Sequence, residues 1–456
     1  MQWNWPLPSA LPITASNGKK WNFLLMVGDD WPLDMFSEMP TFNSTYASGF
    51  IVFPNAVSEI PLCFPSRAST YTGQSARYTT VTSNDNGDTY SVEALYRTVH
   101  TSLQGAGYHV GFVGKVYNGL GEGGAGGFGT LPWHHPGVNY MSGQWDAPDY
   151  FDWLELQSDG TTAARGTTDT NTTGTDYAVD VERLRALTFL SGVPTGKPWF
   201  LTWASKGCHQ GNHGGGEPEP PSRYASTSVT LTEDPKTFGI DPTSLGIPDW
   251  AANDAEVPWD STAVEAIRTS HRLALRVTRA IDEGLCAVMA EIEARGETDN
   301  TIIMVMCDNA IGMGELRMSG KGNPHKSGTD ILLRVKVPGI SGNTCYAPVC
   351  NYDIAPTICA LAGAVPAVTP YGMSFHSLLE DVNKPWREAA FMINPDRSPT
   401  FYGLKFGGNP GAVYYRIAAG GGNTPATGGW TDLAQSVNVD IPGAAEILQA
   451  LEDSVS

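Results

Sequence analysis

Short runs of apolar residues recur along the first 340 residues of the chain, and polar or glycine-rich sequence follows each run. The clearest runs cover residues 22–27, 109–113, 198–204 and 301–306. Continuous apolar runs of this length, rich in valine, isoleucine and phenylalanine, are typical of strands buried on both faces of a sheet. Apolar residues at helical spacing predict a long helix from 261 to 295. This alternation predicts an α/β fold, with a large mixed, mostly parallel central sheet sandwiched by helices.

Two regions interrupt the alternation, and a third changes it. Residues 119–180 are rich in glycine, threonine and aromatics, and residues 207–260 in glycine, proline, serine and threonine. Loops this long in a compact domain are usually functional or mobile, so we predict that they line the substrate side. After residue 379 short apolar segments predict antiparallel strands, and a helix follows near 444–451. We therefore expect an N-terminal extension (1–20), an α/β domain (21–380) and a small C-terminal α+β subdomain (381–456).

The charge balance excludes one class of function. Lysine and arginine number 28 against 47 aspartates and glutamates, a net charge of −19. Nucleic-acid binding needs clustered cations, so we expect no nucleic-acid partner. No apolar segment is long enough for a membrane span, so we expect no membrane partner. The N-terminus has prolines at positions 6, 8 and 12 and no basic region, so we expect no signal peptide, and a cytoplasmic protein or one exported by a non-classical route.

Seven cysteines are scattered along the chain without a regular spacing. This pattern predicts mostly reduced thiols rather than a disulfide framework. Cys345 and Cys350 are close enough in sequence to form a small loop disulfide, but two unpaired thiols near a turn is the favoured interpretation.

Polar side chains follow each of the four apolar runs. Because ligands bind beyond the carboxyl ends of strands in open α/β sheets, we expect these side chains to meet at one edge. Each residue alone is also explained as a turn or helix cap, but four strands ending in such residues favour a site. They are Asp29 and Asp30 after the first run, Lys115 after the second, Lys206 and His209 after the third, and Asp308 and Asn309 after the fourth.

The acidic and amide residues of this group predict a metal site. Adjacent carboxylates repel each other unless a cation lies between them. Asp29, Asp30, Asp308 and Asn309 offer only oxygen ligands, which suits a hard divalent ion, Ca²⁺ or Mg²⁺.

The segment CFPSRASTYTG, residues 63–73, predicts an anion site. Pro65 suits the first turn of a helix and Gly73 suits its C-terminal cap, so Cys63 and Arg67 belong near the helix N-terminus. Free backbone N–H groups and the helix dipole bind anions there, and arginine adds a planar fork for an oxyanion. A cysteine in this position is expected to have a lowered pKa. The segment therefore predicts a phosphate or sulfate site with a nucleophile at residue 63.

The same segment resembles the signature of the type I, formylglycine-dependent sulfatases of the alkaline phosphatase superfamily. The resemblance covers residues 22 to about 380, and the 21–380 region is then the catalytic domain. The GKV-aromatic pattern at 114–117 and the histidine of SKGCHQ at 205–210 are most similar to the iduronate-sulfatase-like branch. The other matching segments, in order, are LLMVGDD at 24–30, GYHVGFVGK at 107–115, DNTIIMVMCDNAIG at 299–312, GKGN at 320–323 and NYDIAPTICALAG at 351–363.

The resemblance implies that Cys63 is oxidised to formylglycine by a formylglycine-generating enzyme, which reads Pro65 and Arg67. The hydrated aldehyde is then the nucleophile and a ligand of Ca²⁺ or Mg²⁺. Arg67 is implied to orient the nucleophile, and Lys115 and Lys321 to bind the sulfate oxygens. His209 is implied to contact the sulfate or to protonate the leaving oxygen.

The chain departs from the family pattern at two places. Tyr117 and Asn118 stand where the family commonly has a histidine, and Lys326 stands where a glutamate is usual. Tyr117 or Asn118 can hydrogen-bond the nucleophile, but neither can move a proton near neutral pH as histidine does. His134 or His135 could replace the missing histidine on the substrate side, or the pair could simply decorate a surface loop.

The resemblance favours a sulfated carbohydrate as substrate. Four aromatic residues could stack on sugar rings, or could be ordinary packing: Trp133, Trp145, Tyr150 and Trp153. The net negative charge favours a small or sparsely sulfated substrate over a polyanion. Two alternatives remain open, a phosphodiesterase or phosphonate monoester hydrolase of the same superfamily, and a noncatalytic carbohydrate-binding homologue. The complete set of site residues argues against the noncatalytic alternative.

Overall fold

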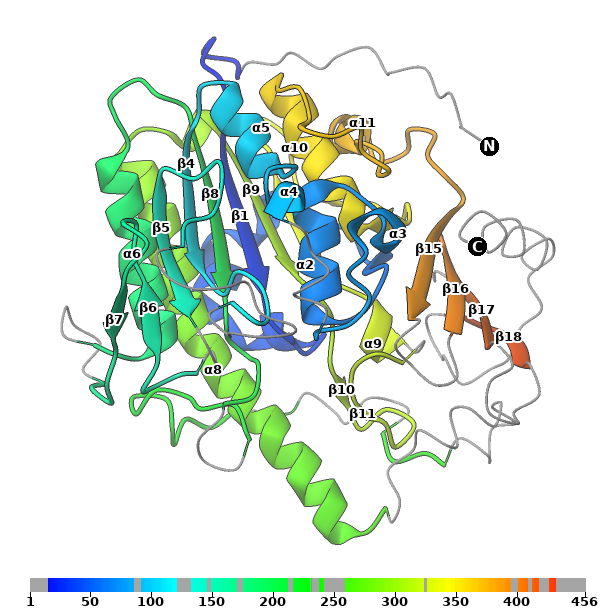
Figure 1. Ribbon diagram of the computed structural model, residues 1–456. Helices are drawn as coiled ribbons and strands as arrows, with labels where there is room; N and C mark the ends of the chain where they lie inside the picture. The colour runs from blue at the N-terminus through cyan, green and yellow to red at the C-terminus, as the bar shows by residue number, and fades with distance from the viewer. Residues whose placement is uncertain are drawn as a thin grey trace.

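A ten-stranded mixed sheet forms the centre of the protein (Figure 1). The computed structural model describes residues 15–85, 92–120, 133–145, 149–169, 175–211, 216–229, 231, 238–241, 259–323, 326–394, 401–408, 412–417 and 426–431. In spatial order the strands are β13 (Asn343–Thr344), β2 (Ile51–Val52), β12 (Leu333–Lys336), β9 (Thr301–Cys307), β1 (Asn22–Gly28), β8 (Trp199–Ser205), β4 (His109–Gly114), β5 (Tyr140–Trp145), β6 (Leu154–Leu156) and β7 (Thr162–Ala164).

The middle of this sheet is parallel, from β9 through β1, β8 and β4 to β5. Strands β12, β6 and β7 run antiparallel to their neighbours and make the sheet mixed. Every residue of β1, β8 and β9 is buried, as expected for strands covered on both faces. The predictions of a strand in each of the four apolar runs and of a mostly parallel sheet are confirmed.

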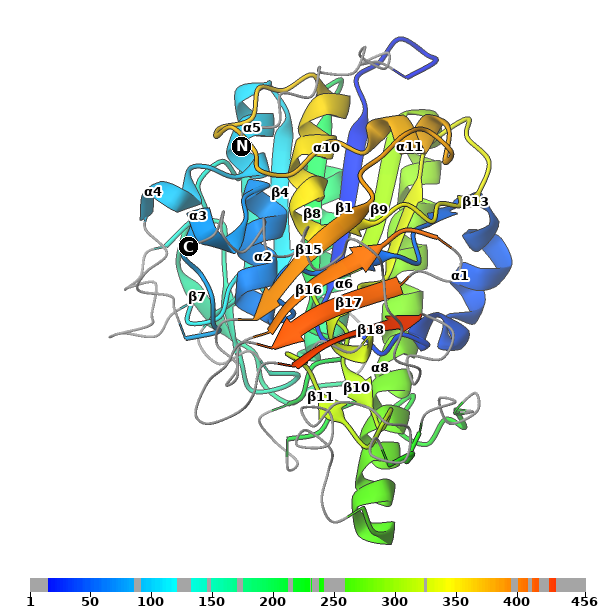
Figure 2. The ribbon, with the colours of Figure 1, turned by 90° about the vertical axis from the view of Figure 1, so that its right-hand side faces the viewer.

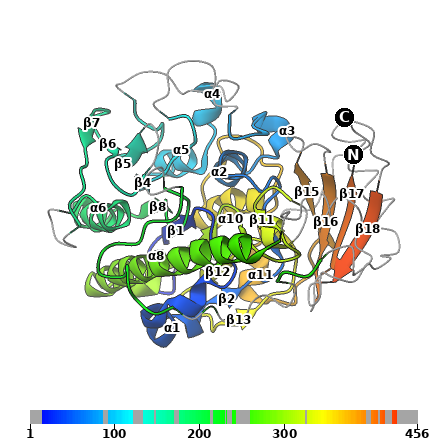
Figure 3. The same cartoon turned by 90° about the horizontal axis from the view of Figure 1, so that it is seen from below.

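Helices cover both faces of the sheet, as predicted (Figure 3). One layer contains α1 (Pro40–Thr45), α6 (Ala178–Gly192) and α8 (Ser261–Ala294). The other contains α2 (Cys63–Thr72), α5 (Val99–Gly105) and α10 (Ile354–Ala362). Asp260 caps the predicted long helix α8, because its carboxylate accepts hydrogen bonds from the backbone N–H groups of residues 262 and 263.

Short elements connect these layers. The 3₁₀ helices are η1 (Met35–Glu38), η2 (Ala47–Gly49), η4 (Thr298–Asn300) and η5 (Asn351–Asp353). The short strands are β3 (Ala56–Val57), β10 (Gly312–Met313), β11 (Ser319–Gly320) and β14 (Val349–Cys350), and the short helices are α3 (Ala76–Thr79), α4 (Val92–Leu95), α9 (Lys326–Thr329) and α11 (His376–Glu380).

A second sheet follows the central domain in the chain (Figure 2). It is antiparallel, in the order β15 (Ala389–Asn394), β16 (Phe401–Phe406), β17 (Ala412–Ile417) and β18 (Ala426–Thr431). The predicted antiparallel sheet is confirmed. The helix predicted near 444–451 lies outside the described residues, and the domain boundaries at 20 and 380 remain predictions.

The prediction of continuous loops across 119–180 is wrong. Strands β5, β6 and β7 lie in this region and extend the central sheet, and α6 begins at its end. Strand β5 was not predicted because it contains serine, glycine and glutamine, whereas sequence patterns identify strands by branched apolar residues. Among the residues that the structure describes, no helix has the length and apolar character needed to cross a membrane. All seven cysteines are buried and unpaired, which confirms the expectation of reduced thiols, Cys345 and Cys350 included.

Candidate active site

The carboxyl ends of β1, β4, β8 and β9 meet at the lower edge of the sheet in Figure 1. Backbone hydrogen bonds connect the segments that follow these strands. The N–H of Lys115 donates to the carbonyl of Ala204 (2.8 Å), that of Cys208 to Asp29 (2.9 Å), and that of Asp308 to the carbonyl of residue 28 (2.9 Å). The sheet therefore fixes the polar residues after the four strands at one edge, as predicted.

Helix α2 belongs to the same layer as α5 and α10, and it places Cys63 at this edge of the sheet. Cys63 is its first residue, after the extended Leu62, and Gly73 ends the helix in a left-handed conformation with φ of 68°. Both ends therefore agree with the sequence prediction. The Ser66 hydroxyl donates to the backbone oxygen of Asp308 (2.6 Å) and secures the helix against β9.

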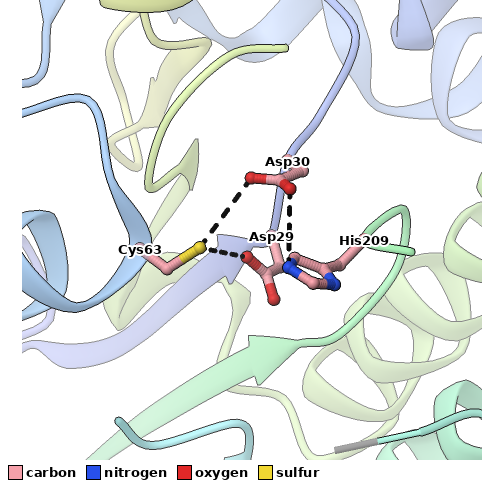
Figure 4. A group of neighbouring side chains, drawn as sticks. All are labelled: Asp29, Asp30, Cys63 and His209. Carbon is pink, nitrogen blue, oxygen red and sulfur yellow. Dashed lines mark hydrogen bonds and ion pairs between the residues drawn. The ribbon is translucent and has the colours of Figure 1, made fainter. Parts of the chain in front are cut away.

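The Cys63 sulfur lies among charged side chains (Figure 4). It is 2.8 Å from Lys321 Nζ, 3.2 Å from Asp29 Oδ1 and 3.9 Å from Asp30 Oδ1. Burial and the neighbouring Asp29 carboxylate raise the pKa of the thiol to about 12, against the opposing effect of Lys115 and Lys321. The expectation of a lowered pKa is wrong, because burial outweighs the helix N-terminus. The unmodified thiol is therefore a poor nucleophile at neutral pH.

Buried ion pairs hold the carboxylates in place. Lys115 Nζ is 2.5 Å from Asp29 Oδ2, and Lys321 Nζ is 2.6 Å from Asp30 Oδ1. Burial disfavours the charge of Asp29, but Lys115, His209 and Arg67 outweigh it and hold the pKa of Asp29 well below its usual value. Asp29 is therefore ionised at neutral pH and available to a cation.

Arg67 connects α2 to the segments that follow two strands. Its side chain is fully buried. Its Nε donates to Asp308 Oδ2 at 2.8 Å, and its Nη1 donates to the backbone oxygen of Lys115. Burial together with the Asp29 charge raises the pKa of Asp308, and Arg67 opposes this shift. Arg67 thus supplies a fixed positive charge close to Cys63.

The arrangement fits a divalent cation. Ligand atoms of Asp29, Asp30, Cys63 and His209 all lie within 4.8 Å of one another. The amide oxygen of Asn309 is buried and has no hydrogen-bond partner, while its Nδ2 donates to Asp30 Oδ1 at 2.6 Å. An unpaired buried oxygen beside two carboxylates is the donor set that Ca²⁺ and Mg²⁺ prefer. His209 joins this cluster, although the sequence did not indicate it as a metal ligand.

His209 lies at the open side of the site. Its side chain is 29% exposed, and its Nε2 is 3.6 Å from Asp30 Oδ2. Nδ1 lies 2.9 Å from the backbone oxygen of Gln210, so the hydrogen of a neutral ring belongs on Nδ1. Burial lowers the pKa of His209 to about 4, and the Asp29 charge offsets only part of this shift. Lys206 donates to the same Gln210 oxygen (2.7 Å) and supports the turn.

The prediction that His135 binds substrate is wrong. Its ring is fully buried and packs against His100 and Phe112, with ring centres 4.8 and 5.6 Å away. Burial lowers the pKa of His135 to about 4. His134 is half-buried and its Nδ1 faces the backbone oxygen of His135. His135 is therefore neither on the surface nor a replacement for the missing histidine, whereas the substrate role of His134 stays a prediction.

Tyr117 and Asn118 follow β4 and Lys115. The Tyr117 ring is buried and packs on Phe64 (5.4 Å between centres) and Tyr71 (5.9 Å), both on α2. Asn118 is half-buried, and its side-chain oxygen is buried without a hydrogen-bond partner. Tyr117 therefore supports the helix from behind, and the catalytic roles predicted for both residues stay predictions.

The aromatic residues proposed to stack on sugar rings form part of the core. Trp145, Tyr150 and Trp153 are buried, and the half-buried Trp133 packs against Trp145. The sugar-stacking interpretation is wrong for the three buried residues, because β5 and β6 carry this region into the sheet.

The sequence reasoning missed two supporting residues, Asn351 and Glu182. The Asn351 amide donates to the oxygens of Ser66, beside Arg67. Glu182 on α6 accepts the N–H of Lys206 (3.1 Å) and so fixes the turn that carries His209. The only available signal for Asn351 was its place in the NYDIAPT segment. Lys326, where a glutamate was expected, pairs instead with Asp330 at 3.6 Å.

This geometry agrees with comparisons to known proteins. A family model described as Sulfatase matches residues 22–364, so the chain belongs to the sulfatase family. It is 25% identical to the N-acetylglucosamine-6-sulfatase of Capra hircus over 82% of this chain and 66% of the relative. It is 24% identical to the N-acetylglucosamine-6-O-sulfatase of Bacteroides thetaiotaomicron over 82% of this chain and 74% of the relative. The chain thus spans slightly less than two thirds of the goat relative, and 59% of the bovine protein of the same name.

Solved structures share the fold. One, described as a complex with its substrate D-glucosamine-2-N,6-O-disulfate, has a TM-score of 0.67 at 20% identity and covers 96% of this chain and 98% of its own. A phosphonate monoester hydrolase from Silicibacter pomeroyi has a TM-score of 0.69 at 17% identity, and the match covers 95% of this chain and 94% of the hydrolase. The alkaline phosphatase superfamily fold is confirmed. The sulfatase relatives above are named for N-acetylglucosamine 6-sulfate, so the iduronate-sulfatase-like branch stays a prediction.

Proposed function

We propose that this protein is a sulfatase that hydrolyses the 6-O-sulfate ester of a glucosamine-type sugar. The observation that carries the proposal is the position of Cys63, at the N-terminus of a helix, 3.2 Å from Asp29 and 2.8 Å from Lys321. Membership of the sulfatase family supports the reaction class. The names of the relatives support the sugar, and a net charge of −19 favours a small substrate over a polyanion.

The proposed nucleophile is formylglycine derived from Cys63. Its hydrate would supply one hydroxyl to attack sulfur and a second to release the sulfate, which a thiol cannot do. The raised pKa of the Cys63 thiol, about 12, supports this assignment because the unmodified side chain is protonated at neutral pH. A formylglycine-generating enzyme is then a required partner during synthesis.

Fixed charges surround the proposed nucleophile. Ca²⁺ or Mg²⁺, held by Asp29, Asp30, Asp308 and Asn309 together with the modified Cys63, would polarise the sulfate ester and position it. Lys115 and Lys321 would donate to sulfate oxygens as negative charge develops. Arg67 would orient the nucleophile, because its guanidinium is buried and cannot move away.

His209 is proposed as a contact to the substrate sulfate group. Its Nε2 faces the carboxylates, and its pKa of about 4 keeps the ring neutral at pH 7. Sulfate oxygens only accept hydrogen bonds, so this contact would require the hydrogen on Nε2 in place of the Nδ1 hydrogen that the Gln210 oxygen favours. A neutral ring in that tautomer would donate to a sulfate oxygen but would be a weak acid towards the leaving oxygen. We therefore favour the contact role over the proton donor role.

The test is a substrate comparison on protein produced together with a formylglycine-generating enzyme. Glucosamine 6-sulfate, a phosphonate monoester and a phosphodiester are assayed with the same preparation in Ca²⁺ and in Mg²⁺. The proposal predicts the highest kcat/KM for the sulfate ester. A higher kcat/KM for a phosphorus ester would instead favour the phosphonate hydrolase function, and binding of the sugar without turnover would favour a noncatalytic homologue.

A further inference from the structure

Lys321 directly follows β11, and its side chain reaches Cys63 at the start of α2. Lys321 Nζ is 2.8 Å from Cys63 Sγ and 2.6 Å from Asp30 Oδ1, and its side chain is 17% exposed. A lysine side chain has several rotatable bonds, so its ammonium group is well placed only where the backbone is fixed. The contacts that fix the backbone at Lys321 therefore determine where its ammonium group lies.

A residue of the C-terminal sheet holds this backbone. Asn394 ends β15 and is 3% exposed. Its Nδ2 donates to the carbonyl oxygen of Gly322, next to Lys321, at 2.8 Å. A Cβ on Gly322 would lie 3.1 Å from that Nδ2 and 3.7 Å from Leu62, and its φ is +83°. The absence of a side chain thus lets the loop lie between Asn394 and the residue that precedes Cys63.

The same strand also contacts the segment that leads into α2. The N–H of Ile393 donates to the carbonyl oxygen of Glu59 (2.7 Å). Ile60 packs in a buried cluster with Phe391, Ile393 and Leu404 of the C-terminal sheet. One strand is therefore connected to both sides of the contact between Lys321 and Cys63.

A second anchor lies beyond the loop. Lys405 on β16 is fully buried, and its Nζ is 3.2 Å from Asp330 Oδ2. Asp330 directly follows α9, so the C-terminal sheet holds the Lys321 segment at two places. A buried ion pair is costly to break, because removing one partner leaves an uncompensated charge.

We propose that Asn394 is a positioning residue that sets Lys321 against the nucleophile, so that the C-terminal sheet is part of the catalytic apparatus. Its kinetic test rests on the proposed sulfatase function. Asn394 touches the backbone next to Lys321, and it acts on the reaction through Lys321.

The kinetic test is a double-mutant cycle between Asn394→Ala and Lys321→Ala, measured as kcat and KM for glucosamine 6-sulfate. Misplacing a group that binds the transition state costs about 10- to 100-fold in rate. We expect Asn394→Ala to lower kcat by this factor, with a smaller change in KM. In the Lys321→Ala background the same change should have no further effect, because non-additivity marks residues that act together.

Asn55→Ala is the matched control. Asn55 is fully buried, and its Nδ2 donates to the carbonyl oxygens of Tyr346 (2.7 Å) and residue 408 (2.9 Å). It therefore connects the central domain with the segment after β16 without touching the Lys321 loop. We expect a loss of Tm similar to that of Asn394→Ala and an unchanged kcat. An equal loss of kcat in both variants would overturn the proposal, as would full additivity in the cycle.

A footprint of lysine reactivity tests the same contact without any assay of turnover. The rate of reductive methylation of Lys321 is measured by peptide mass spectrometry, with the exposed Lys19 as internal reference. We expect faster labelling of Lys321 in Asn394→Ala and an unchanged rate in Asn55→Ala. Equal rates in wild type and Asn394→Ala would refute the positioning role. A protein that shows the footprint change but hydrolyses no sulfate ester would refute the proposed function alone.

Discussion

Two buried polar clusters of the described residues, one around Cys63 and one formed by His100 and His135, differ in their electrostatics. In the cluster around Cys63, opposite charges compensate burial: Lys115 and Arg67 keep Asp29 ionised, and Lys321 does the same for Asp30. In the cluster of His100 and His135, burial meets no compensating charge, and the pKa of both rings is lowered. Compensated charge, rather than burial of polar groups, therefore distinguishes the candidate active site.

The largest expected effect is that of Cys63→Ala. Removing the group from which the nucleophile is made should lower kcat by at least about 10⁴-fold. The fold should remain, because alanine suits the first turn of α2 and removes no buried charge. Turnover of glucosamine 6-sulfate and circular dichroism check the two parts. Activity near the wild-type value would show that another residue is the nucleophile.

Asp29→Asn should weaken Ca²⁺ affinity by at least about tenfold, because the number of charged ligands sets the affinity of such sites. Titration calorimetry on metal-free protein measures the change. Asp282→Asn is the matched control, since Asp282 is buried on α8 and accepts the N–H groups of residues 41 and 42. Equal affinity in wild type and Asp29→Asn would remove Asp29 from the metal site.

A pair of histidine variants compares the two clusters directly. His209→Ala should lower kcat/KM for glucosamine 6-sulfate by about 10²-fold, the order expected for a group that contacts the reacting atoms. His135→Phe should leave it within about threefold, because the phenyl ring replaces a buried ring in an aromatic cluster. A larger loss in His135→Phe than in His209→Ala would reverse the assignment of the two clusters.

The smallest predicted effect concerns stability in acid. The unfolded His135 binds a proton near pH 6.5, whereas burial lowers its folded pKa to about 4. The contribution of His135 therefore lowers the free energy of unfolding as pH falls from 6.5 towards 4, by up to about 3 kcal/mol. His135→Phe should lose less stability than wild type over this range. Urea unfolding measures the free energy of unfolding of both proteins at pH 7 and pH 5. An equal loss of that free energy in wild type and in His135→Phe would contradict the burial argument.

The sequence contained enough to predict the central fold and the position of the site. Buried strands such as β1 and β9 are unbroken apolar runs, and Pro65 and Gly73 mark the ends of α2. Because parallel strands end at one edge, the residues after them had to meet there. The polar sequence of β5 gave no such signal, so the strands at the edge of the sheet were missed.

Properties that depend on distant packing were not predictable. The pKa of Cys63 follows from complete burial beside Asp29, and local helix geometry suggested the opposite direction. The sequence suggests that His135 is a loop histidine, but in the structure it packs against His100 of α5 and Phe112 of β4. Asn394 lies 72 residues from Gly322 in sequence, and nothing in either segment indicates their hydrogen bond.

The central claim is that Cys63 becomes the formylglycine nucleophile of a sulfatase. The protein is produced with and without a formylglycine-generating enzyme, and the converted fraction of the peptide that contains Cys63 is measured by mass spectrometry. The account predicts that kcat for glucosamine 6-sulfate rises in proportion to the converted fraction and vanishes when conversion is zero. Full activity in protein whose Cys63 is entirely unconverted would contradict it.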